Sequence, residues 1–413
     1  MNKYLVTLVL IFCLAFALIV SGNEKILPSE AIQKISASLS SPNIASMTIA
    51  EIFDLRKDKT KKMLPSVQVS ELSLDEALIL ADIYGWAGKY DDAEKCLNEF
   101  INEDASKSRQ IHKKLIDVSV NAYRFDKTET LLSGYLEKYQ PKTGELDYLM
   151  REFGAISVIA SFLGKHDFVV RLTHKIAASL DLDQPYLAWS TMFVVTRSSF
   201  VDTGRADELS ELVSSKLETL NKKIEGLSVE GGEAAQIKQS YQRIRQSFRN
   251  CLHQLSLEGK PAPHFNFEKL FNTSAFDLNE LRGKVVLLDF WTNWCGPCKA
   301  SFPKMVKLQE EFGPRGFQIV GLTYLQGSFT DNGISKNDLT AEEEYMLTED
   351  MIKRYKMTWP VGFASKAAVT EDYGVSGFPT LVLVDRKGIV RRIEAGLANE
   401  KMVVEYLKKL LDE

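Results

Sequence analysis

The sequence predicts a chain with two structural parts, an all-helical part followed by an α/β part. Between about residues 73 and 224, apolar residues recur with the 3.6-residue period of amphipathic helices. After residue 259, short apolar runs bounded by turn residues alternate with helical stretches, which is the pattern of an α/β unit. At 413 residues, the chain is long enough for two or three domains of about 150 residues each.

The N-terminus has the pattern of an export signal. Met1-Asn2-Lys3 is followed by an uncharged, mostly apolar run from Tyr4 to Val20 and then by small residues. We expect residues 1–22 to be a signal peptide, with an uncleaved anchor over residues 4–20 as the alternative. Either way the body is expected to be extracytoplasmic, periplasmic or secreted. A dithiol in that compartment needs an external electron source to stay reduced.

The helical part is expected to consist of stacked hairpins. Residues 23–72 read as a tether with a short helix near Ile49–Leu55, and residues 73–224 as four helical hairpins. The turns share a basic residue, at positions 89, 124, 165 and 205, and an aspartate that opens the next helix. These basic residues are 35, 41 and 40 positions apart, a period typical of helical repeat arrays. A linker helix is expected over residues 225–258.

The first hairpin resembles a tetratricopeptide repeat. The residues at that family's spacing are Leu80-Ala81, Tyr84, Gly88, Tyr90 and Ala93. The other three hairpins keep the turn but lose the small residue that matches Ala93. The resemblance implies a concave face that binds a protein partner, with a spacer or dimerisation module as the alternative.

Charge and cysteine content exclude some classes of protein. A net charge of −4 leaves no basic field for nucleic acid. Five cysteines are too few for a disulfide scaffold, so the pair Cys295 and Cys298 stands out. Cys96 and Cys251 lie on apolar helical faces, which favours inert buried thiols over a bridge between them.

The α/β part is expected over residues 259–413. Strands are predicted at 284–291, 317–324, about 360–363, 380–385 and 389–395. Helices are predicted at 296–311, about 341–356, 367–373 and 399–411. Asp385 to Gly388 reads as a hairpin turn between the last two strands.

Cys295 and Cys298 follow the first of these strands at CxxC spacing, where a helix should begin. The positive end of a helix dipole stabilises a thiolate and makes a cysteine nucleophilic below its free pKa. The pattern therefore predicts a thiol–disulfide redox site that needs no bound cofactor beyond its own disulfide. No second CxxC or histidine pair completes a zinc site, so no metal is expected.

Further motifs add a family resemblance. Trp294-Cys295-Gly296-Pro297-Cys298, Pro303 and the segment Tyr373 to Thr380 together resemble the thioredoxin superfamily. The entry segment 259–265, Leu281-Arg-Gly-Lys284 and an insertion at about 326–358 are similar to its TlpA/ResA-like extracytoplasmic redoxins. This resemblance covers residues 259–413 and implies a thioredoxin-fold α/β sandwich.

The resemblance also implies roles for the site residues. Cys295, as the more exposed thiol, is expected to attack the substrate disulfide, and Cys298 to resolve the mixed disulfide. Gly296 and Pro297 set the active-site turn. Phe378-Pro379 matches the cis-proline site, where backbone pairs with an extended substrate. The expected apolar docking patch consists of Trp294, Gly377, Phe378 and Gly396.

One departure from the family concerns the acidic residue that would deprotonate Cys298. Members usually carry a glutamate three residues after the second cysteine, where this chain has Ser301. Asp289 instead matches the buried acid of ordinary thioredoxins, and Gly321 stands where their neighbouring lysine lies. A carboxyl in an apolar strand should have a raised pKa, so Asp289 is the expected base for Cys298.

The most strongly indicated function is reduction of disulfides in other exported proteins, with electrons from a membrane thiol donor. Cys-Gly-Pro-Cys accompanies reducing members of the family. Two alternatives stay open. Thr292-x-x-Cys295 mimics part of a peroxiredoxin site, which suggests a thiol peroxidase. The helical array could instead bind a partner under redox control, which suggests a scaffold.

Overall fold

A computed structural model describes residues 27–38, 49–64, 67, 72–101, 105–139, 143–179, 188–227, 232–395 and 400–413. The expected signal segment 1–22 and Gly396 lie outside the described residues. The chain forms two compact units, one of residues 1–160 with 171–180 and one of residues 161–170 with 181–413. No helix among the described residues is long and apolar enough to cross a membrane.

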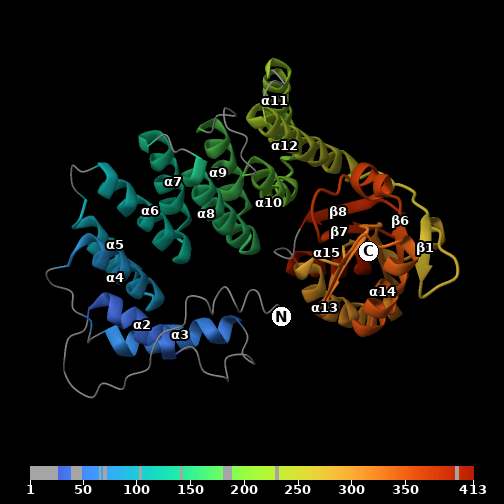
Figure 1. The fold of residues 1–413 in the computed structure, drawn as a ribbon, viewed down its shortest axis with the longest axis horizontal. Helices are drawn as coiled ribbons and strands as arrows, with labels where there is room; N and C mark the ends of the chain where they lie inside the picture. The colour runs from blue at the N-terminus through green and yellow to red at the C-terminus, as the bar shows by residue number, and fades with distance from the viewer. Residues whose placement is uncertain are drawn as a thin grey trace. The chain divides into compact units, whose positions relative to one another are not determined.

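The N-terminal part is helical, as predicted (Figure 1). The described residues of the stretch 23–72 contain α2 and α3, and α3 extends well past the expected short helix. Hairpins follow at α4–α5, α6–α7, α8–α9 and α10–α11. The helices are α2 (Pro28–Ser38), α3 (Ile49–Met63), α4 (Leu74–Trp86), α5 (Tyr90–Asn98), α6 (Ala105–Asn121), α7 (Phe125–Tyr139), α8 (Thr143–Phe162), α9 (His166–Ser179), α10 (Ala188–Asp202), α11 (Ala206–Gly226) and α12 (Gly232–Leu257).

The hairpin turns explain the repeated sequence pattern. Gly88, Gly164 and Gly204 have positive φ angles of 75°, 70° and 68°, a conformation that glycine adopts without steric cost. In the second hairpin Tyr123 takes the same conformation, with φ 57°. An aspartate lies in the first turn of each following helix, where its charge suits the helix dipole.

The α/β part contains a six-stranded sheet in the order β1-β6-β3-β2-β7-β8. Strands β2 and β3, and β3 and β6, pair in parallel, and the remaining pairs are antiparallel. The five predicted strands are present, at β2 (Val285–Phe290), β3 (Phe317–Thr323), β6 (Val361–Ala364), β7 (Thr380–Val384) and β8 (Val390–Ala395). The prediction missed β1 (Phe267–Phe271) and a separate hairpin of β4 (Ser328–Asp331) and β5 (Ile334–Asn337).

Helices cover both faces of this sheet. One apolar cluster joins alternate residues of β2 and β3 to α13 (Gly296–Phe312), α14 (Ala341–Arg354) and α15 (Glu400–Asp412). The other joins the intervening residues to the end of α12 and to a π-helical turn at Ala368–Asp372. Short 3₁₀ turns lie at Leu278–Leu281 and Gly313–Arg315. Because β2 is buried on both faces, it is a rigid support for the residues that follow it.

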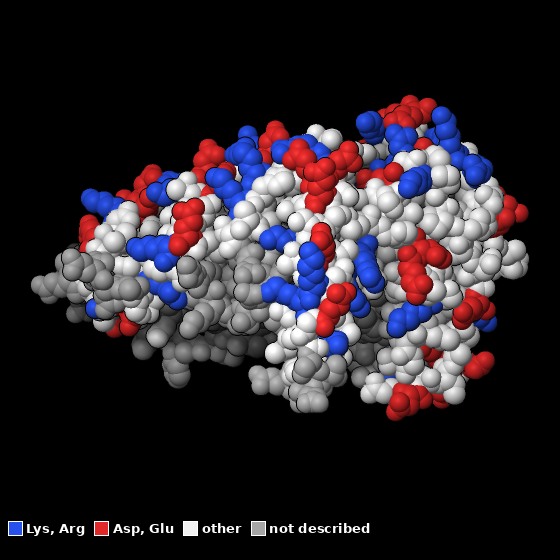
Figure 2. All heavy atoms as spheres, turned by 90° about the horizontal axis from the view of Figure 1, so that it is seen from above, with Lys and Arg blue, Asp and Glu red and all other residues white. Residues whose placement is uncertain are grey.

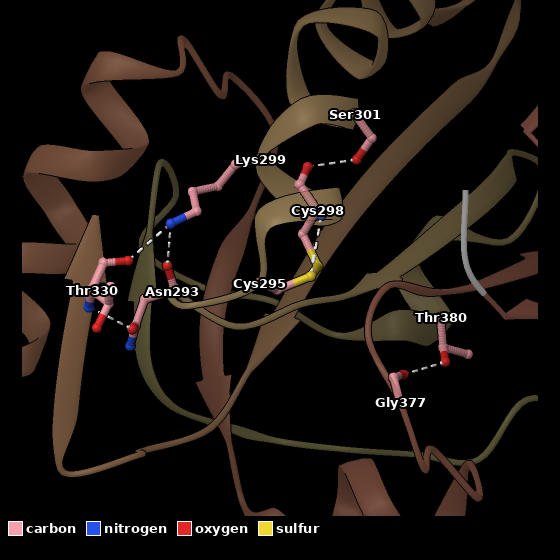
Figure 3. Close-up of a disulfide and its surroundings, with 8 residues drawn as sticks. All are labelled: Asn293, Cys295, Cys298, Lys299, Ser301, Thr330, Gly377 and Thr380. Atoms are coloured by element: carbon pink, nitrogen blue, oxygen red, sulfur yellow. Dashed lines mark hydrogen bonds between the residues drawn. A yellow bond between two sulfur atoms is a disulfide. The ribbon is translucent and has the colours of Figure 1, made fainter. Parts of the chain in front are cut away.

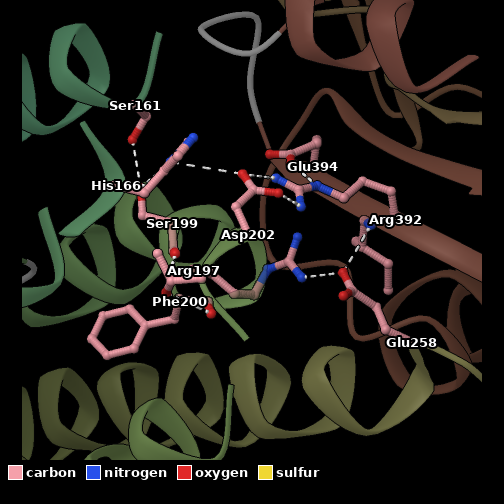
Figure 4. A network of polar contacts seen from close by, with 11 residues as sticks. Ser161, His166, Arg197, Ser199, Phe200, Asp202, Glu258, Arg392 and Glu394 are labelled. Atoms are coloured by element: carbon pink, nitrogen blue, oxygen red, sulfur yellow. Dashed lines mark hydrogen bonds and ion pairs between the residues drawn. The ribbon is translucent and has the colours of Figure 1, made fainter. Parts of the chain in front are cut away.

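Charged side chains also join α10 and α12 to the sheet within the second unit (Figure 4). Arg392 on β8 donates to Asp202 at 2.5 and 3.0 Å and to Glu394 at 2.5 Å. Glu258, just after α12, accepts from Arg197 of α10 at 2.6 Å and from the backbone N–H of Ile393 at 3.1 Å. Figure 2 shows acidic and basic groups interspersed on one face of the molecule.

Candidate active site

Cys295 and Cys298 form a disulfide at the start of α13, directly after β2 (Figure 3). Cys295 is the N-cap residue, and its Sγ accepts a hydrogen bond from the N–H of Cys298 at 3.1 Å. Gly296 and Pro297 form the first turn of the helix, as predicted. Cys295 is 3% exposed and Cys298 is fully buried, so the predicted order of exposure holds by a small margin.

The cis-proline segment packs, through Phe378, against the apolar cluster that contains Cys295 and Cys298. The Phe378–Pro379 peptide bond is cis, and Thr380 Oγ1 donates to the carbonyl of Gly377 at 2.8 Å, which closes this turn (Figure 3). Trp294 is half-exposed, and its ring meets that of Phe378 edge-on with centroids 5.9 Å apart. The structure therefore brings together every described member of the predicted docking patch.

Asp289 lies on β2 in the same core as the disulfide, and its side chain is 1% exposed. Burial raises its pKa to about 7, as the sequence predicted in direction. Among the described residues neither carboxyl oxygen has a hydrogen-bond partner. An unpaired buried carboxyl favours its protonated form, which places its titration close to neutral pH.

The strand beside Asp289 shows why no lysine neighbours it. Gly321 on β3 pairs in register with Asp289. A Cβ atom at Gly321 would lie 3.2 Å from Nε1 of Trp291 and 3.4 Å from Nε1 of Trp359. Both indoles are buried, and they fill the space that a longer side chain would need. Two indole N–H groups thus lie beside the strand position that pairs with Asp289.

Ser301 does not replace the family's glutamate. Its side chain is buried, and its Oγ donates to the carbonyl of Cys298 within the same helix at 2.6 Å. A hydroxyl engaged with its own helix backbone is no base at neutral pH. Asp289, which lies on β2 itself and is buried, therefore stays the candidate base for Cys298.

The insertion is bonded to two residues beside the cysteines, Asn293 and Lys299, that were not predicted from the sequence. Asn293 donates to the carbonyl of Ser328 at 2.8 Å and accepts from the N–H of Thr330 at 3.0 Å. Lys299, next to Cys298, donates to the carbonyls of Asn293 and Thr330, both at 2.9 Å (Figure 3). The hairpin β4–β5 is thereby fastened to the active-site loop.

A sequence signal for this hairpin was available. Asn332 and Gly333 both have positive φ angles, 47° and 79°, and Asn-Gly is the strongest short-range hairpin signal. The contacts of Asn293 and Lys299 had no such signal, because they depend on where the hairpin packs.

Two other thiols lie outside this site. Cys96 and Cys251 are free cysteines. Burial, with Glu99 nearby, raises the pKa of Cys96 to about 11, and burial raises that of Cys251 to about 12. Both thiols stay protonated at neutral pH, which agrees with the prediction of unreactive thiols.

A CxxC disulfide at a helix N-terminus, beside a cis-proline and over a central buried strand, defines a thiol–disulfide oxidoreductase with a thioredoxin fold. Comparisons with known proteins agree. Residues 257–410 match the Redoxin family model. The thioredoxin-like protein YneN of Bacillus subtilis is 30% identical over 150 residues, which are 36% of this chain and 78% of YneN. The thiol-disulfide oxidoreductase ResA of the same organism is also 30% identical over 150 residues, 74% of its length.

Solved structures resemble the same part of the chain. The thioredoxin domain of a thiol-disulfide oxidoreductase from Bacteroides vulgatus is 25% identical, with a TM-score of 0.29, over 36% of this chain and 97% of that one. A thiol:disulfide interchange protein from a Bacteroides species is 26% identical, with a TM-score of 0.29, over 37% of this chain and 90% of that one. Through its C-terminal domain, the chain belongs to the redoxin family of thiol-disulfide oxidoreductases.

Proposed function

We propose that this protein is an extracytoplasmic oxidoreductase that reduces disulfides in other exported proteins. The observation that carries the proposal is the asymmetry of the two cysteines. Cys295 caps α13 next to the half-exposed ring of Trp294, whereas Cys298 is fully buried one turn along. The half-exposed ring of Trp294 gives Cys295 an apolar surface on which a substrate chain could dock.

The reaction begins with the dithiol form. The Cys295 thiolate attacks one sulfur of the substrate disulfide, which breaks, and the departing substrate sulfur takes up a proton. Cys298 then loses its proton and attacks Sγ of Cys295. The second substrate thiolate leaves, so the substrate gains two electrons and the enzyme holds the Cys295–Cys298 disulfide. A thiol donor in the membrane would reduce that disulfide and restore the enzyme.

Asp289 is the proposed base for Cys298. Its carboxyl lies in the core that also contains Cys298, and its pKa of about 7 suits proton exchange at neutral pH. The thiolate of Cys295 is stabilised by the dipole of α13 and by the hydrogen bond that its Sγ accepts from the N–H of Cys298. The two cysteines thus have separate sources of activation.

The finer parts of the proposal rest on the sequence. The apolar run after Lys3 supports export, and Cys-Gly-Pro-Cys supports the reducing direction through the family resemblance. The helical hairpins provide a surface that a protein partner could bind. The substrate docking patch would include Gly396 beyond the end of β8 in addition to Trp294, Gly377 and Phe378.

Trapping of mixed disulfides tests this function. In a Cys298→Ser variant the second attack is impossible, so we expect exported proteins to accumulate on Cys295. Cys295→Ser is the control and should trap nothing. If the Cys298→Ser variant traps no protein, or if it consumes peroxide as fast as the unmodified chain, the reductase proposal fails and the peroxidase alternative gains support.

A further inference from the structure

The insertion contains a buried carboxylate that the reaction does not use. Helix α14 begins with a capping box in which Thr340 and Glu343 satisfy each other's backbone N–H groups. Glu342 and Glu343 are exposed, as expected at a helix start. Glu344 follows them directly, yet its side chain has no exposed surface. A buried carboxylate is costly unless it is fully hydrogen-bonded, so its contacts are informative.

Glu344 holds the loop that follows β3. Its two carboxyl oxygens accept from the backbone N–H of Gln326 at 3.0 Å each, and Oε2 accepts from the N–H of Gly327 at 2.8 Å. The side-chain amide of Asn293 also donates to Oε1, at 3.5 Å. An ionised carboxylate is an acceptor only, and donors converge on both of its oxygens here. The carboxylate therefore fixes both the loop and the residue two positions before Cys295.

That loop in turn holds the exposed wall of the docking patch. The Oε1 atom of Gln326 accepts a hydrogen bond from Nε1 of Trp294 at 3.2 Å. Gln326 is itself oriented by a bond from its Nε2 to the carbonyl of Tyr324 at 3.2 Å. The ring of Tyr324 continues the patch, with its centroid 6.3 Å from that of Phe378. Three aromatic rings thus lie side by side near the disulfide.

We propose that Glu344 is a positioning residue that fixes Trp294 as the exposed wall of the docking patch, and so selects disulfides flanked by a large apolar side chain. The inference rests on the proposed reductase function and names the substrate class. A half-exposed indole without these contacts would sample other rotamers, and binding would have to order it. Holding the ring in place beforehand removes that cost for a substrate that packs against it. A small polar disulfide such as glutathione disulfide gains nothing from this wall.

The substitution Glu344→Gln tests the proposal with little change in size. One end of an amide is a donor, so it would face the N–H of Gln326 or Gly327 without an acceptor. We expect KM for a peptide disulfide with phenylalanine beside its cysteine to rise about five- to tenfold, with kcat unchanged. Turnover of glutathione disulfide should not change. Glu342→Gln, the same substitution on the exposed side of α14, is the matched control and should leave KM and turnover unchanged for both substrates.

A second variant and a second readout keep the test decisive. Gln326→Ala removes the hydrogen bond to Trp294 but keeps the backbone N–H of residue 326 that Glu344 accepts from. It should raise KM for the phenylalanine-flanked peptide and leave KM for glutathione disulfide unchanged. The indole ¹H–¹⁵N signal of Trp294 should shift and broaden in both variants, while those of the buried Trp291 and Trp359 stay in place. If both variants slow the two disulfides equally, or leave the Trp294 signal unmoved, Glu344 is only structural and the proposal is overturned. If the unmodified protein reduces neither disulfide, the reductase function fails, and the indole signals still test the positioning.

Discussion

Asp289 shows how a single buried residue affects both stability and chemistry. Its carboxyl is inside the core, so the folded chain keeps a proton that the unfolded chain loses near pH 4. Between those two pKa values the folded state binds more protons, and stability must fall as the pH rises. With a folded pKa of about 7, the loss is complete above neutrality and amounts to ~4 kcal/mol.

The first prediction therefore concerns Asp289→Asn. The variant should be as stable as the unmodified oxidised protein near pH 4, and more stable by up to ~4 kcal/mol at pH 8. Urea unfolding at several pH values measures this difference. Asp385→Asn is the contrasting control. Burial alone would raise the pKa of Asp385, but bonds from Ile389, Arg391 and Lys387 outweigh burial and lower it, so that variant loses stability above pH 4.

The same variant separates the role of a base from that of a buried acid. If Asp289 deprotonates Cys298, Asp289→Asn should slow resolution of a mixed disulfide about 10²-fold or more at pH 7, because general base catalysis contributes that much. The rate should then recover as the pH rises towards the free thiol pKa. Rapid-mixing measurements of resolution between pH 6 and 9 give the profile. An unchanged rate across that range would leave Asp289 with a structural role only.

Patterns in the sequence predicted the residues proposed to take part in the reaction, but not the residues that hold them in place. The cysteine pair, the cis-proline and Asp289 were predictable, because each lies in a short motif or at a fixed strand position. Glu344 and Gln326 were not, although Glu344 lies in a stretch that reads as an ordinary acidic helix start. Its burial depends on the loop that packs over it, a tertiary contact that leaves no period or motif in the sequence.

The same distinction applies to whole elements. Four of the five predicted strands were predictable because they are buried, largely apolar and bounded by turn residues, and β8 because apolar residues are interspersed with charged ones after the turn at Asp385 to Gly388. Strand β1 was missed because it lies at the edge of the sheet and is largely solvated, so its sequence, Phe-Glu-Lys-Leu-Phe, lacks a buried apolar run. The β4–β5 hairpin lies inside the insertion, where the Asn332-Gly333 turn was the available signal.

A further prediction concerns how β1 is held against β6. Gly362 on β6 pairs with Leu270 on β1. A Cβ atom there would lie 2.4 Å from the ring of Phe267 and 2.7 Å from the backbone oxygen of Lys269. Backbone cannot move aside cheaply, so Gly362→Ala should destabilise the protein by about 1–3 kcal/mol through overpacking. Denaturant unfolding of the oxidised protein measures the change.

Gly154→Ala is the control for that substitution. Gly154 lies inside α8, and a Cβ atom there would meet nothing within 4 Å. Alanine is the better helix former, so this variant should gain about 0.5–1 kcal/mol. Equal effects of the two substitutions would mean that β1 yields to the added methyl group and is held only loosely.

At the scale of the whole molecule, the thioredoxin-fold domain forms one compact unit together with some of the preceding helices. Helices α10, α11 and α12 belong to the same compact unit as the sheet. A chain cut at the predicted boundary near residue 259 keeps β8 but lacks Asp202 and Glu258, which accept hydrogen bonds from Arg392 and from the N–H of Ile393 on that strand. Since β8 pairs with β7, and β7 begins directly after Pro379, these helices support the strand pair that borders the site.

The last prediction tests that support through Asp202. Arg392 is 1% exposed, and Asp202 and Glu394 are its two carboxylate partners in Figure 4. Removal of one partner of a buried ion pair costs about 3–5 kcal/mol, and the remaining bond to Glu394 offsets part of this. Asp202→Asn should therefore cost about 2–3 kcal/mol in urea unfolding, with little dependence on salt because buried pairs are weakly screened. Asp207→Asn, an exposed acid in the first turn of α11, should cost less than about 1 kcal/mol and lose its effect in salt. If the two variants are equally stable, the network is dispensable and α10 is not needed to hold the sheet.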